Sequence, residues 1–432
     1  MPGLIPPDRV QHRSLLHEAM VSALNAAHPA ENLATYLLPS DHAGRTVVLA
    51  AGKAAVAMAA AAHWILGDRI EGVALTRYGH SGDLVLPKSI EVVEAAHPVP
   101  DHKGEMAARK VLDLATALTE QDRCIVLLSG GGSALLALPG HGITLADKQA
   151  IARDLLASGA TVSEMNCVRK HLSAIKGGRL ALAAAPARVE NYIISDVAGD
   201  DPATIASGPT MADMSTLADA RRILRRYGIA PPPAIARALN NPKNALPSAD
   251  HPAFARSITH VIATASVALE AAARITVRAG YEPIMLGDDL EGDAAMLGAL
   301  HADHAREWLR CGRRVALISG GECTVTLRNR DGQGGPNGEY LLSLILRLNG
   351  TAGVFALAID SDGIDGTGQG AGAIVDPTTL ERARAAGVDL AEALDQNNAH
   401  PAFAALGDLI ITGPTLTNVN DIRIILVDPV VA

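Results

Sequence analysis

The sequence predicts an α/β protein built from two non-similar α/β/α layered domains with mostly parallel sheets. A chain of 432 residues exceeds what one hydrophobic core usually accommodates, so two domains are expected. Near-continuous apolar runs alternate with helical segments, which is typical of sheets covered on both faces. Polar motifs follow directly after the predicted strands, where such sheets bind ligands. We place the domains at residues 1–246 and 247–432.

The composition restricts the class of protein. Hydrophobic residues make up 48%, charged residues 19% and aromatic residues 3%, so we expect a globular protein with an aliphatic core. The net charge of −9 offers no basic field for nucleic acid, and no apolar run reaches the ~20 residues of a membrane span. No signal peptide is recognisable, and the four cysteines form no C-x-x-C pair. We therefore expect a cytoplasmic protein without a zinc site or a disulfide framework.

The first candidate site residue follows the first predicted strand. An amphipathic helix is expected over residues 11–40, a strand over Thr46–Ala51 and a helix over Ala54–Ala62. Lys53 stands at the strand-to-helix junction, where anions bind. Neither the G-x-x-x-x-G-K-[ST] phosphate loop nor the G-x-G-x-x-G dinucleotide fingerprint is present there. A surface lysine is the alternative interpretation of Lys53.

A second candidate follows the predicted strand Cys124–Ser129. This strand leads into three consecutive glycines, whose backbone N–H groups could surround an oxyanion. The alternative is a structural glycine turn. We interpret His97–Asp101 as a rigid turn with a structural histidine. The candidate binding residues of this loop are Ser129, Gly130, Gly131, Gly132 and Ser133.

The stretch Asn166–Gly178 predicts a helix that carries cations beside an apolar stripe. Helical spacing places Arg169, Ser173 and Lys176 on one face. Arg169 is a candidate catalytic residue, and Lys170 and Lys176 are candidate residues for binding substrate or nucleotide. A solvated basic face is the alternative. The buried stripe would consist of Val168, Leu172 and Ile175.

Carboxylates follow the next apolar run, Ile193–Asp201. Asp196 and Asp200 are the candidate metal ligands, and Asp196 is also a candidate catalytic residue. Cations suited to oxyanions thus lie close in sequence to acids suited to a hard metal ion, which indicates phosphoryl chemistry. Between about residues 211 and 257 the sequence pattern is that of helices and loops, and we interpret this region as a connection.

Three motifs of the second half lie next to predicted strands: two follow a strand, and the third precedes the last strand. Gly320 and Glu322 follow one predicted strand, and the acidic loop Asp360–Gly366 follows another. A calcium-binding loop is excluded because Ile364 and Ala371 occupy ligand positions. The candidate binding residues are Gly320, Glu322, Asp362, Asp365, Asn418 and Asn420. The predicted strands of this half are 259–264, 283–286, 314–319, 354–360, 409–412 and 422–427.

Taken together, these motifs resemble the glycerate 2-kinase family, whose C-terminal part is called the MOFRL domain. The resemblance covers nearly the whole chain, and the ordered matches make it specific. It rests on Ala51–Ala55, His97–Asp101, Ser129–Leu135, Asn166–Gly178, Ser195–Asp201, Ser207–Thr210, Ser319–Glu322, Asp360–Gly366 and Thr412–Asp421. It implies an N-terminal kinase domain, a MOFRL region at about 313–427, a cleft between the domains, ATP and a divalent metal, Mg²⁺. It also implies that Lys53 is the active-site lysine.

One departure from the family concerns a cation. The family often has G-G-R-N-Q-E where this chain has Gly334–Glu339, so Pro336 stands at the position of the arginine. Either another cation supplies that charge or this member treats its substrate differently. Some relatives have carried the label hydroxypyruvate reductase, from a tartrate-utilisation context.

The function that the sequence predicts is phosphorylation of D-glycerate at the 2-hydroxyl by ATP. Lys53 would neutralise the transferred phosphoryl group, while Arg169 and Lys176 would bind a phosphate or the glycerate carboxylate. Asp362 and Asp365 would orient the hydroxyl or the metal. The alternatives are an NAD(P)H-dependent hydroxypyruvate reductase and a non-catalytic sugar-acid or nucleotide sensor. D-glycerate is the expected small-molecule substrate. For the oligomeric state, a homodimer is the hypothesis.

Overall fold

The chain forms two compact units that are interleaved in sequence. The computed structural model describes residues 7–40 and 43–429. The N-terminal unit is Pro29–Ile262, and the C-terminal unit combines Met1–His28 with Ala263–Ala432. The units are therefore not divided at residues 246 and 247. Helix α1 (Pro7–Ala26) belongs with the C-terminal unit, and strand β6 (Ser257–Ala263) closes the sheet of the N-terminal unit.

The N-terminal unit contains the parallel sheet that the apolar runs predict. Its strands lie in the order β3-β2-β1-β4-β5-β6, and the pairings from β3 to β5 are parallel. Strands β2 and β3 had no counterpart among the predicted strands. The bounds are β1 (Thr46–Ala51), β2 (Ile70–Arg77), β3 (Ile90–Ala95), β4 (Arg123–Leu128) and β5 (Arg188–Ile194).

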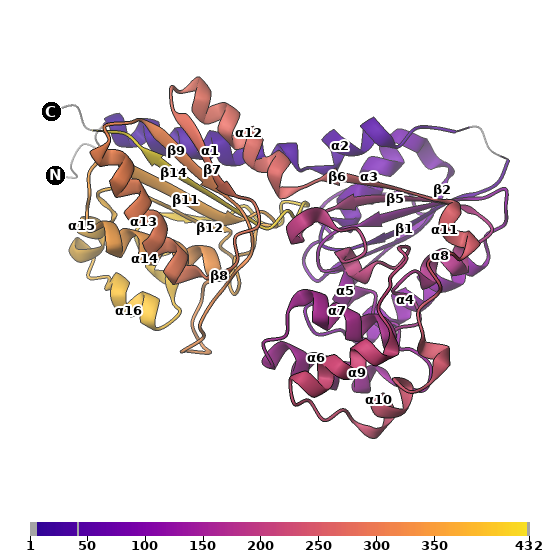
Figure 1. Cartoon of the computed structure of the whole chain (residues 1–432). Helices are drawn as coiled ribbons and strands as arrows, with labels where there is room; N and C mark the ends of the chain where they lie inside the picture. Colours follow the sequence, from indigo (N-terminus) through magenta and orange to yellow (C-terminus); the bar gives the residue numbers. More distant parts are fainter. Residues whose placement is uncertain (1–6, 41–42, 430–432) are drawn as a thin grey trace. The chain divides into compact units, whose positions relative to one another are not determined.

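Helices cover both faces of this sheet. Helices α2 (Pro29–Tyr36) and α3 (Ala55–Leu66) lie on one face, and α4 (His102–Thr116) and α8 (Arg179–Ala184) on the other (Figure 1). Alanine, valine and leucine side chains fill the core between α4, α8 and the strands, as the low aromatic content predicts. Two short helices, α5 (Gly132–Leu135) and α11 (Pro252–Ala255), complete this layer.

A separate group of helices packs together within the same unit. Its core is made of aliphatic side chains from α6 (Leu145–Ala157), α7 (Val162–His171), α9 (Leu217–Arg226) and α10 (Pro233–Ala238). Figure 1 shows the four helices gathered beside α5. The region predicted to be a connection, 211–257, therefore contributes to a hydrophobic core, because α9 buries Ile223 and Leu224 against α7.

The helix predicted across Asn166–Gly178 ends early. Helix α7 stops at His171, and residues 172–178 form turns. The Ser173 hydroxyl accepts hydrogen bonds from the N–H groups of Ile175 and Lys176, both at 3.3 Å, and this local bonding competes with helix continuation. The prediction that Arg169, Ser173 and Lys176 share one helical face is therefore wrong. The residues of the predicted apolar stripe, Val168, Leu172 and Ile175, are nevertheless buried.

The C-terminal unit has a mixed sheet, which corrects the expectation of a mostly parallel one. The strand order is β13-β12-β11-β14-β9-β7, in which β7 and β9 pair in parallel and the other pairings are antiparallel. Residues 361–371 connect β11 to β12 without a helix, so the second strand can return beside the first in the opposite direction. The bounds are β7 (Glu282–Gly287), β9 (Val315–Ser319), β11 (Val354–Asp360), β12 (Gly372–Val375), β13 (Leu409–Ile410) and β14 (Asp421–Val427), with the small pair β8 (Gly292–Asp293) and β10 (Cys323–Thr324).

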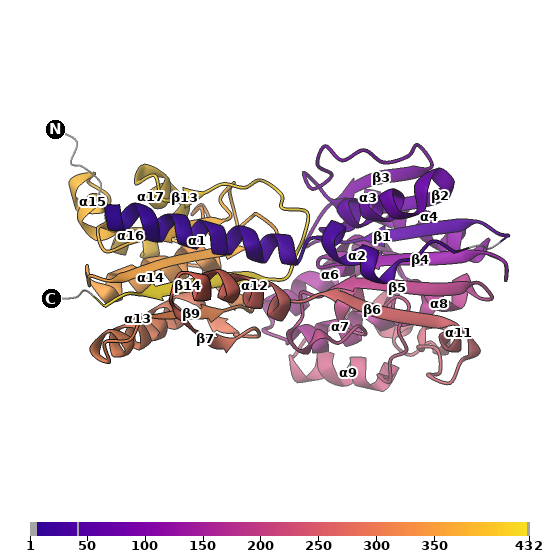
Figure 2. The same cartoon turned by 90° about the horizontal axis from the view of Figure 1, so that it is seen from above.

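The strands read as continuous apolar runs because helices cover both faces of this sheet as well. Helices α1 and α12 (Ala265–Arg278) pack on one face, and α13 (Ala294–Arg310) and α14 (Pro336–Leu348) on the other (Figures 1 and 2). The segment 11–40, predicted as helical, is divided between α1 and α2. The remaining helices are α15 (Thr379–Ala385), α16 (Leu390–Asp395) and α17 (Ala399–Ala405).

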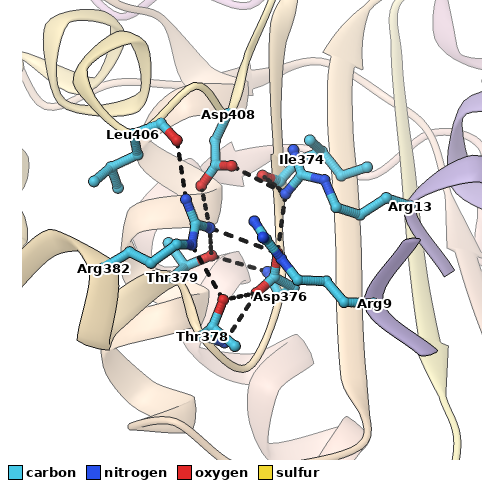
Figure 3. A network of polar contacts seen from close by, with 9 residues as sticks. All are labelled: Arg9, Arg13, Ile374, Asp376, Thr378, Thr379, Arg382, Leu406 and Asp408. Carbon is cyan, nitrogen blue, oxygen red and sulfur yellow. Dashed lines mark hydrogen bonds and ion pairs between the residues drawn. The ribbon is translucent and has the colours of Figure 1, made fainter. Parts of the chain in front are cut away.

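A buried ionic network joins α1 to the rest of the C-terminal unit (Figure 3). The Asp376 carboxylate accepts from Arg9 Nε at 2.7 Å and from Arg13 Nη1 at 3.0 Å. Asp408 lies 3.0 Å from Arg13 and 2.7 Å from Arg382. Both carboxylates are buried, so their negative charges need nearby positive charges, and the arginines of α1 supply them.

Candidate functional site

Residues that follow four strands of the N-terminal unit lie at one edge of its sheet. Lys53 follows β1, His97 follows β3, Ser129 follows β4 and Asp196 follows β5. Because these strands are parallel, their carboxyl ends meet at the same edge. The segments that carry Lys53, Ser129 and Asp196, three of the sequence-predicted residues, therefore end at the same sheet edge.

The Lys53 segment and the triple-glycine loop are tied to each other. The Lys53 N–H donates to the Gly130 carbonyl at 2.8 Å, and the Ala54 N–H donates to Ser129 Oγ at 3.0 Å. The two loops approach so closely that a Cβ at Gly52 would lie 2.2 Å from Ser129 Oγ. Ser129 therefore positions Lys53, and its buried hydroxyl is engaged by the backbone.

His97 lies beside Lys53, which its interpretation as a structural turn residue did not predict. Gly131 has φ +80°, and a Cβ there would lie 3.3 Å from His97 Nε2 and 3.4 Å from Lys53 Cγ. The imidazole and the lysine stem thus flank one glycine. The signal was missing because β3, the strand that His97 follows, was not among the predicted strands.

Ser133 belongs to a buried chain of hydroxyl and amide groups. Its Oγ lies 2.5 Å from Ser207 Oγ, which donates to Asn166 Oδ1 at 3.0 Å. Ala206 and Ser207 have φ of 52° and 60°, a left-handed conformation that costs free energy in residues with a Cβ. No sequence pattern indicated that Ser207 would reach the glycine loop.

Three cations line a pocket behind this loop. Arg169 and Lys176, both predicted from sequence, are joined by Lys148 of α6, which was not. Burial lowers the pKa of Lys176 well below its usual value, with Lys148 and Arg169 contributing repulsion. Burial, with the charges of Arg169 and Arg179, lowers the pKa of Lys148 to about 7. Lys148 occupies the buried face of α6 with Ile151, Ala152 and Leu155, and that position was the missed signal.

Lys170 points elsewhere. Its ammonium lies 2.5 Å from Asp213 Oδ2, and it is absent from the lining of the pocket. This ion pair favours a structural role in joining α7 to the segment before α9.

The candidate metal ligands Asp196 and Asp200 follow β5 and are half-buried. Asp200 has φ +54° in the turn that contains Gly199. Among residues 7–40 and 43–429, no group of three or more His, Cys, Asp or Glu side chains could hold a metal ion. A pair of carboxylates suits Mg²⁺, which is usually bound through one or two carboxylates together with phosphate oxygens and water.

In the C-terminal unit the candidates also share one sheet edge. Gly320 and Glu322 follow β9, Asp362 follows β11, and Asn418 and Asn420 precede the antiparallel strand β14. The register pairs Asp360 with Asp421 and Ser319 with Arg423, so the three segments meet. Glu322 is exposed, and Asp362 and Asn418 are buried.

Asp365 caps a helix. Its Oδ1 accepts from the N–H of Asn337 at 3.0 Å and its Oδ2 from the N–H of Gly338 at 2.8 Å. The side chain is 0% exposed and serves the first turn of α14. This arrangement favours a structural role for Asp365 over the predicted contact with substrate or metal.

Comparison with known proteins identifies the family. Residues 15–240 match a domain of unknown function, DUF4147, and residues 315–421 match the MOFRL family. A glycerate 2-kinase of Pyrococcus horikoshii is 40% identical over 89% of this chain and 88% of that protein. The chain belongs to the glycerate 2-kinase family.

Two further relatives agree with this assignment in sequence or structure. The crystal structure of a glycerate kinase from Thermotoga maritima matches with a TM-score of 0.84 and 36% identity, covering 98% of this chain and all of that one. A protein of Agrobacterium vitis named putative hydroxypyruvate reductase is 48% identical over 97% of this chain and 95% of its own length. The family thus includes proteins that carry either name.

The departure at Pro336 is accommodated structurally in this family member. Pro336 is the first residue of α14, a position that favours proline. Arg423 is the nearby buried cation, but it forms an ion pair with Asp421 and donates to the Gly320 carbonyl at 2.8 Å. Burial raises the pKa of Asp421 to about 6 despite the charge of Arg423. Arg423 is therefore already bonded to residues of the C-terminal unit.

No helix within residues 7–40 and 43–429 is long and apolar enough to cross a bilayer.

Proposed function

We propose that this protein transfers the γ-phosphoryl group of ATP to the 2-hydroxyl of D-glycerate. The observation that carries the proposal is the convergence of Lys53, the glycine loop and the cation-lined pocket in a member of this family. Phosphoryl transfer depends mainly on positioning and charge neutralisation, and this arrangement offers both.

Within the N-terminal unit each group has a proposed task. Lys53 neutralises charge on the transferred phosphoryl group, and its segment is held in place by the bonds from the Lys53 N–H to Gly130 and from the Ala54 N–H to Ser129. Arg169 and Lys176 bind an oxyanion of a substrate, and the backbone of Gly130–Ser133 contributes N–H donors.

Magnesium is the proposed metal, with Asp196 and Asp200 as its carboxylates. When bound, the ion supplies charge neutralisation to phosphate oxygens. In the C-terminal unit, Glu322, Asp362, Asn418 and Asn420 are the proposed contacts to substrate or nucleotide, together with the backbone of Gly320.

The test is an assay of the purified protein with ATP, D-glycerate and Mg²⁺. ATP should be consumed only when D-glycerate and Mg²⁺ are both present, and EDTA should stop the reaction. Phosphorus NMR should place the ester on the C2 oxygen, and coupling to enolase provides an independent check. Light scattering on the same preparation tests the proposed homodimer.

The second candidate activity comes from the name of the Agrobacterium relative. A hydroxypyruvate reductase should bind a nicotinamide nucleotide, and the chain lacks the usual G-x-G-x-x-G fingerprint. Oxidation of NADH by hydroxypyruvate without ATP, at a rate comparable to phosphorylation, would contradict the kinase proposal.

A further inference from the structure

The pocket behind the glycine loop gathers three basic side chains without a carboxylate in its wall. Its polar lining consists of Lys148, Arg169, Lys176 and Ser133, and the remaining lining residues are proline, alanine, isoleucine and leucine. Lys148 is 7% exposed and Lys176 1%. Burying cations together is unfavourable unless an anion accompanies them, so the wall is built for a negatively charged group.

The three cations differ in how they are already bonded. Lys176 donates to the Ser133 carbonyl, and Lys148 donates to the Leu172 carbonyl at 2.8 Å. Each ammonium retains further donors. Arg169 makes no hydrogen bond or ion pair within the described part of the chain, and burial lowers its pKa. A half-buried guanidinium without a counter-ion is the strongest single indication of an absent ligand.

We propose that Lys148 completes a three-cation oxyanion site with Arg169 and Lys176 and binds a charged group of a substrate. The few polar groups among apolar walls suit one carboxylate or one phosphate group. The carboxylate of D-glycerate and a phosphate of the nucleotide share this chemistry. Assigning the anion to a substrate rests on the proposed kinase activity, whereas the preference of the pocket for oxyanions does not.

The competing explanation is that Lys148 only stabilises the fold. Its bond to Leu172 caps the end of α7, and a structural lysine would need no ligand. The two roles differ in what a charge-removing substitution changes. Loss of a cap lowers stability, whereas loss of a ligand contact weakens anion binding.

The experiment compares Lys148→Met and Lys148→Arg with the wild-type protein. Dissociation constants for D-glycerate, ADP and inorganic phosphate are measured by calorimetry, and the melting temperature of each variant is recorded without ligand. We expect Lys148→Met to weaken one substrate about tenfold or more, since a hydrogen bond to a charged group is lost. Lys148→Arg should retain most of the affinity. A selective loss for glycerate identifies the carboxylate as the occupant, and a selective loss for ADP and phosphate identifies the nucleotide.

Two controls keep the test decisive. Lys88→Met removes an exposed lysine of the same unit and should leave every dissociation constant unchanged. Arg169→Met should fold, because Arg169 has no bonds to lose, and should weaken the same ligand as Lys148→Met. Dissociation constants within twofold of wild type in both pocket variants would overturn the inference. If the wild type bound anions in this way but did not phosphorylate glycerate, the proposed function would fail and the site would stand.

Discussion

At the scale of single residues, the cations of the N-terminal unit belong to two groups. Lys53 lies at the sheet edge, and its backbone is bonded to the glycine loop. Lys148 and Lys176 are buried, and burial lowers the pKa of both. The first group suits a charge that moves during reaction, and the second suits a fixed charge on a bound substrate.

Replacing Lys53 by alanine should separate these tasks. We expect kcat to fall roughly 10²-fold or more, because a contact made mainly in the transition state is lost. The dissociation constant for glycerate should change much less, since the buried cations remain. Steady-state kinetics and calorimetry measure the two quantities. Near-wild-type kcat with an unchanged melting curve would remove Lys53 from the site.

Gly131→Ala tests whether the contact between the loop, His97 and Lys53 matters. The new Cβ would lie 3.2 Å from His97 Cδ2 and 3.4 Å from Lys53 Cγ, so the His97 ring must shift by a few tenths of an ångström and the lysine stem becomes crowded. Gly142→Ala is the matched control, because Gly142 has φ +81° and nothing within 4 Å of its Cβ position.

Both glycine variants should lose about 1–2 kcal/mol of stability from the left-handed backbone. Only Gly131→Ala should lose most of its activity, by roughly tenfold or more. Chemical denaturation and kcat/KM are the measurements. Equal activity losses in the two variants would show that strain alone matters.

At the scale of elements, the sequence predicted the candidate-site segments without predicting how all of them fold. Strands β1 and β11 agree with the predicted bounds because their apolar runs are bordered by glycine or acidic turns. The helix over Asn166–Gly178 was overextended because helical spacing ignores the Ser173 hydroxyl, which bonds its own backbone. Arg169 and Lys176 nevertheless reach one pocket.

Strand direction was the less predictable property. A strand covered by helices on both faces has the same apolar composition whichever way it runs, so the antiparallel β12 and β14 could not be recognised. Lys148 was missed for a related reason. Its place among the apolar residues of α6 was a signal in the sequence, but only the folded chain places Arg169 and Lys176 beside it.

The ionic network of α1 allows a test at this scale. Asp376→Asn should cost about 3 kcal/mol, because it removes the buried partner of Arg9 and leaves Arg13 with Asp408 alone. Burial raises the pKa of Asp376, but hydrogen bonds from Thr378 and Arg9 outweigh it and hold the pKa below its usual value. The carboxylate therefore stabilises the fold above about pH 4, and this contribution is lost as the pH falls through the lowered pKa.

Denaturation of wild type and Asp376→Asn between pH 2 and pH 7 measures this contribution. The stability difference should be largest near neutral pH and shrink in acid. Asp303→Asn, which removes an exposed partner of Arg347, is the control and should change the melting temperature little. A stability difference independent of pH would contradict the electrostatic explanation.

At the scale of the whole molecule, the N-terminal unit is inserted in sequence between two segments of the C-terminal unit. The predicted boundary at 246 and 247 followed a change in local composition, which reports turns and not long-range packing. The packing of α1 on the sheet of the C-terminal unit involves residues more than 200 positions away. Periodicity predicted one amphipathic helix over residues 11–40 and could identify neither its division into α1 and α2 nor the partner of α1.

The last prediction follows from this interleaving. A fragment of residues 29–262 keeps the six strands of its sheet, including β6, whose residues Ser257 and Thr259 bond to the Asn191 side chain. It should unfold in one cooperative transition. A fragment of residues 1–246 lacks β6 and exposes the side of α1 that buries Leu16 and Met20. It should aggregate or melt without a sharp transition, and calorimetry with light scattering measures both outcomes. Neither fragment should phosphorylate glycerate, because each lacks the proposed contacts of the C-terminal unit. A folded, monomeric fragment 1–246 together with an unfolded fragment 29–262 would restore the boundary predicted from the sequence.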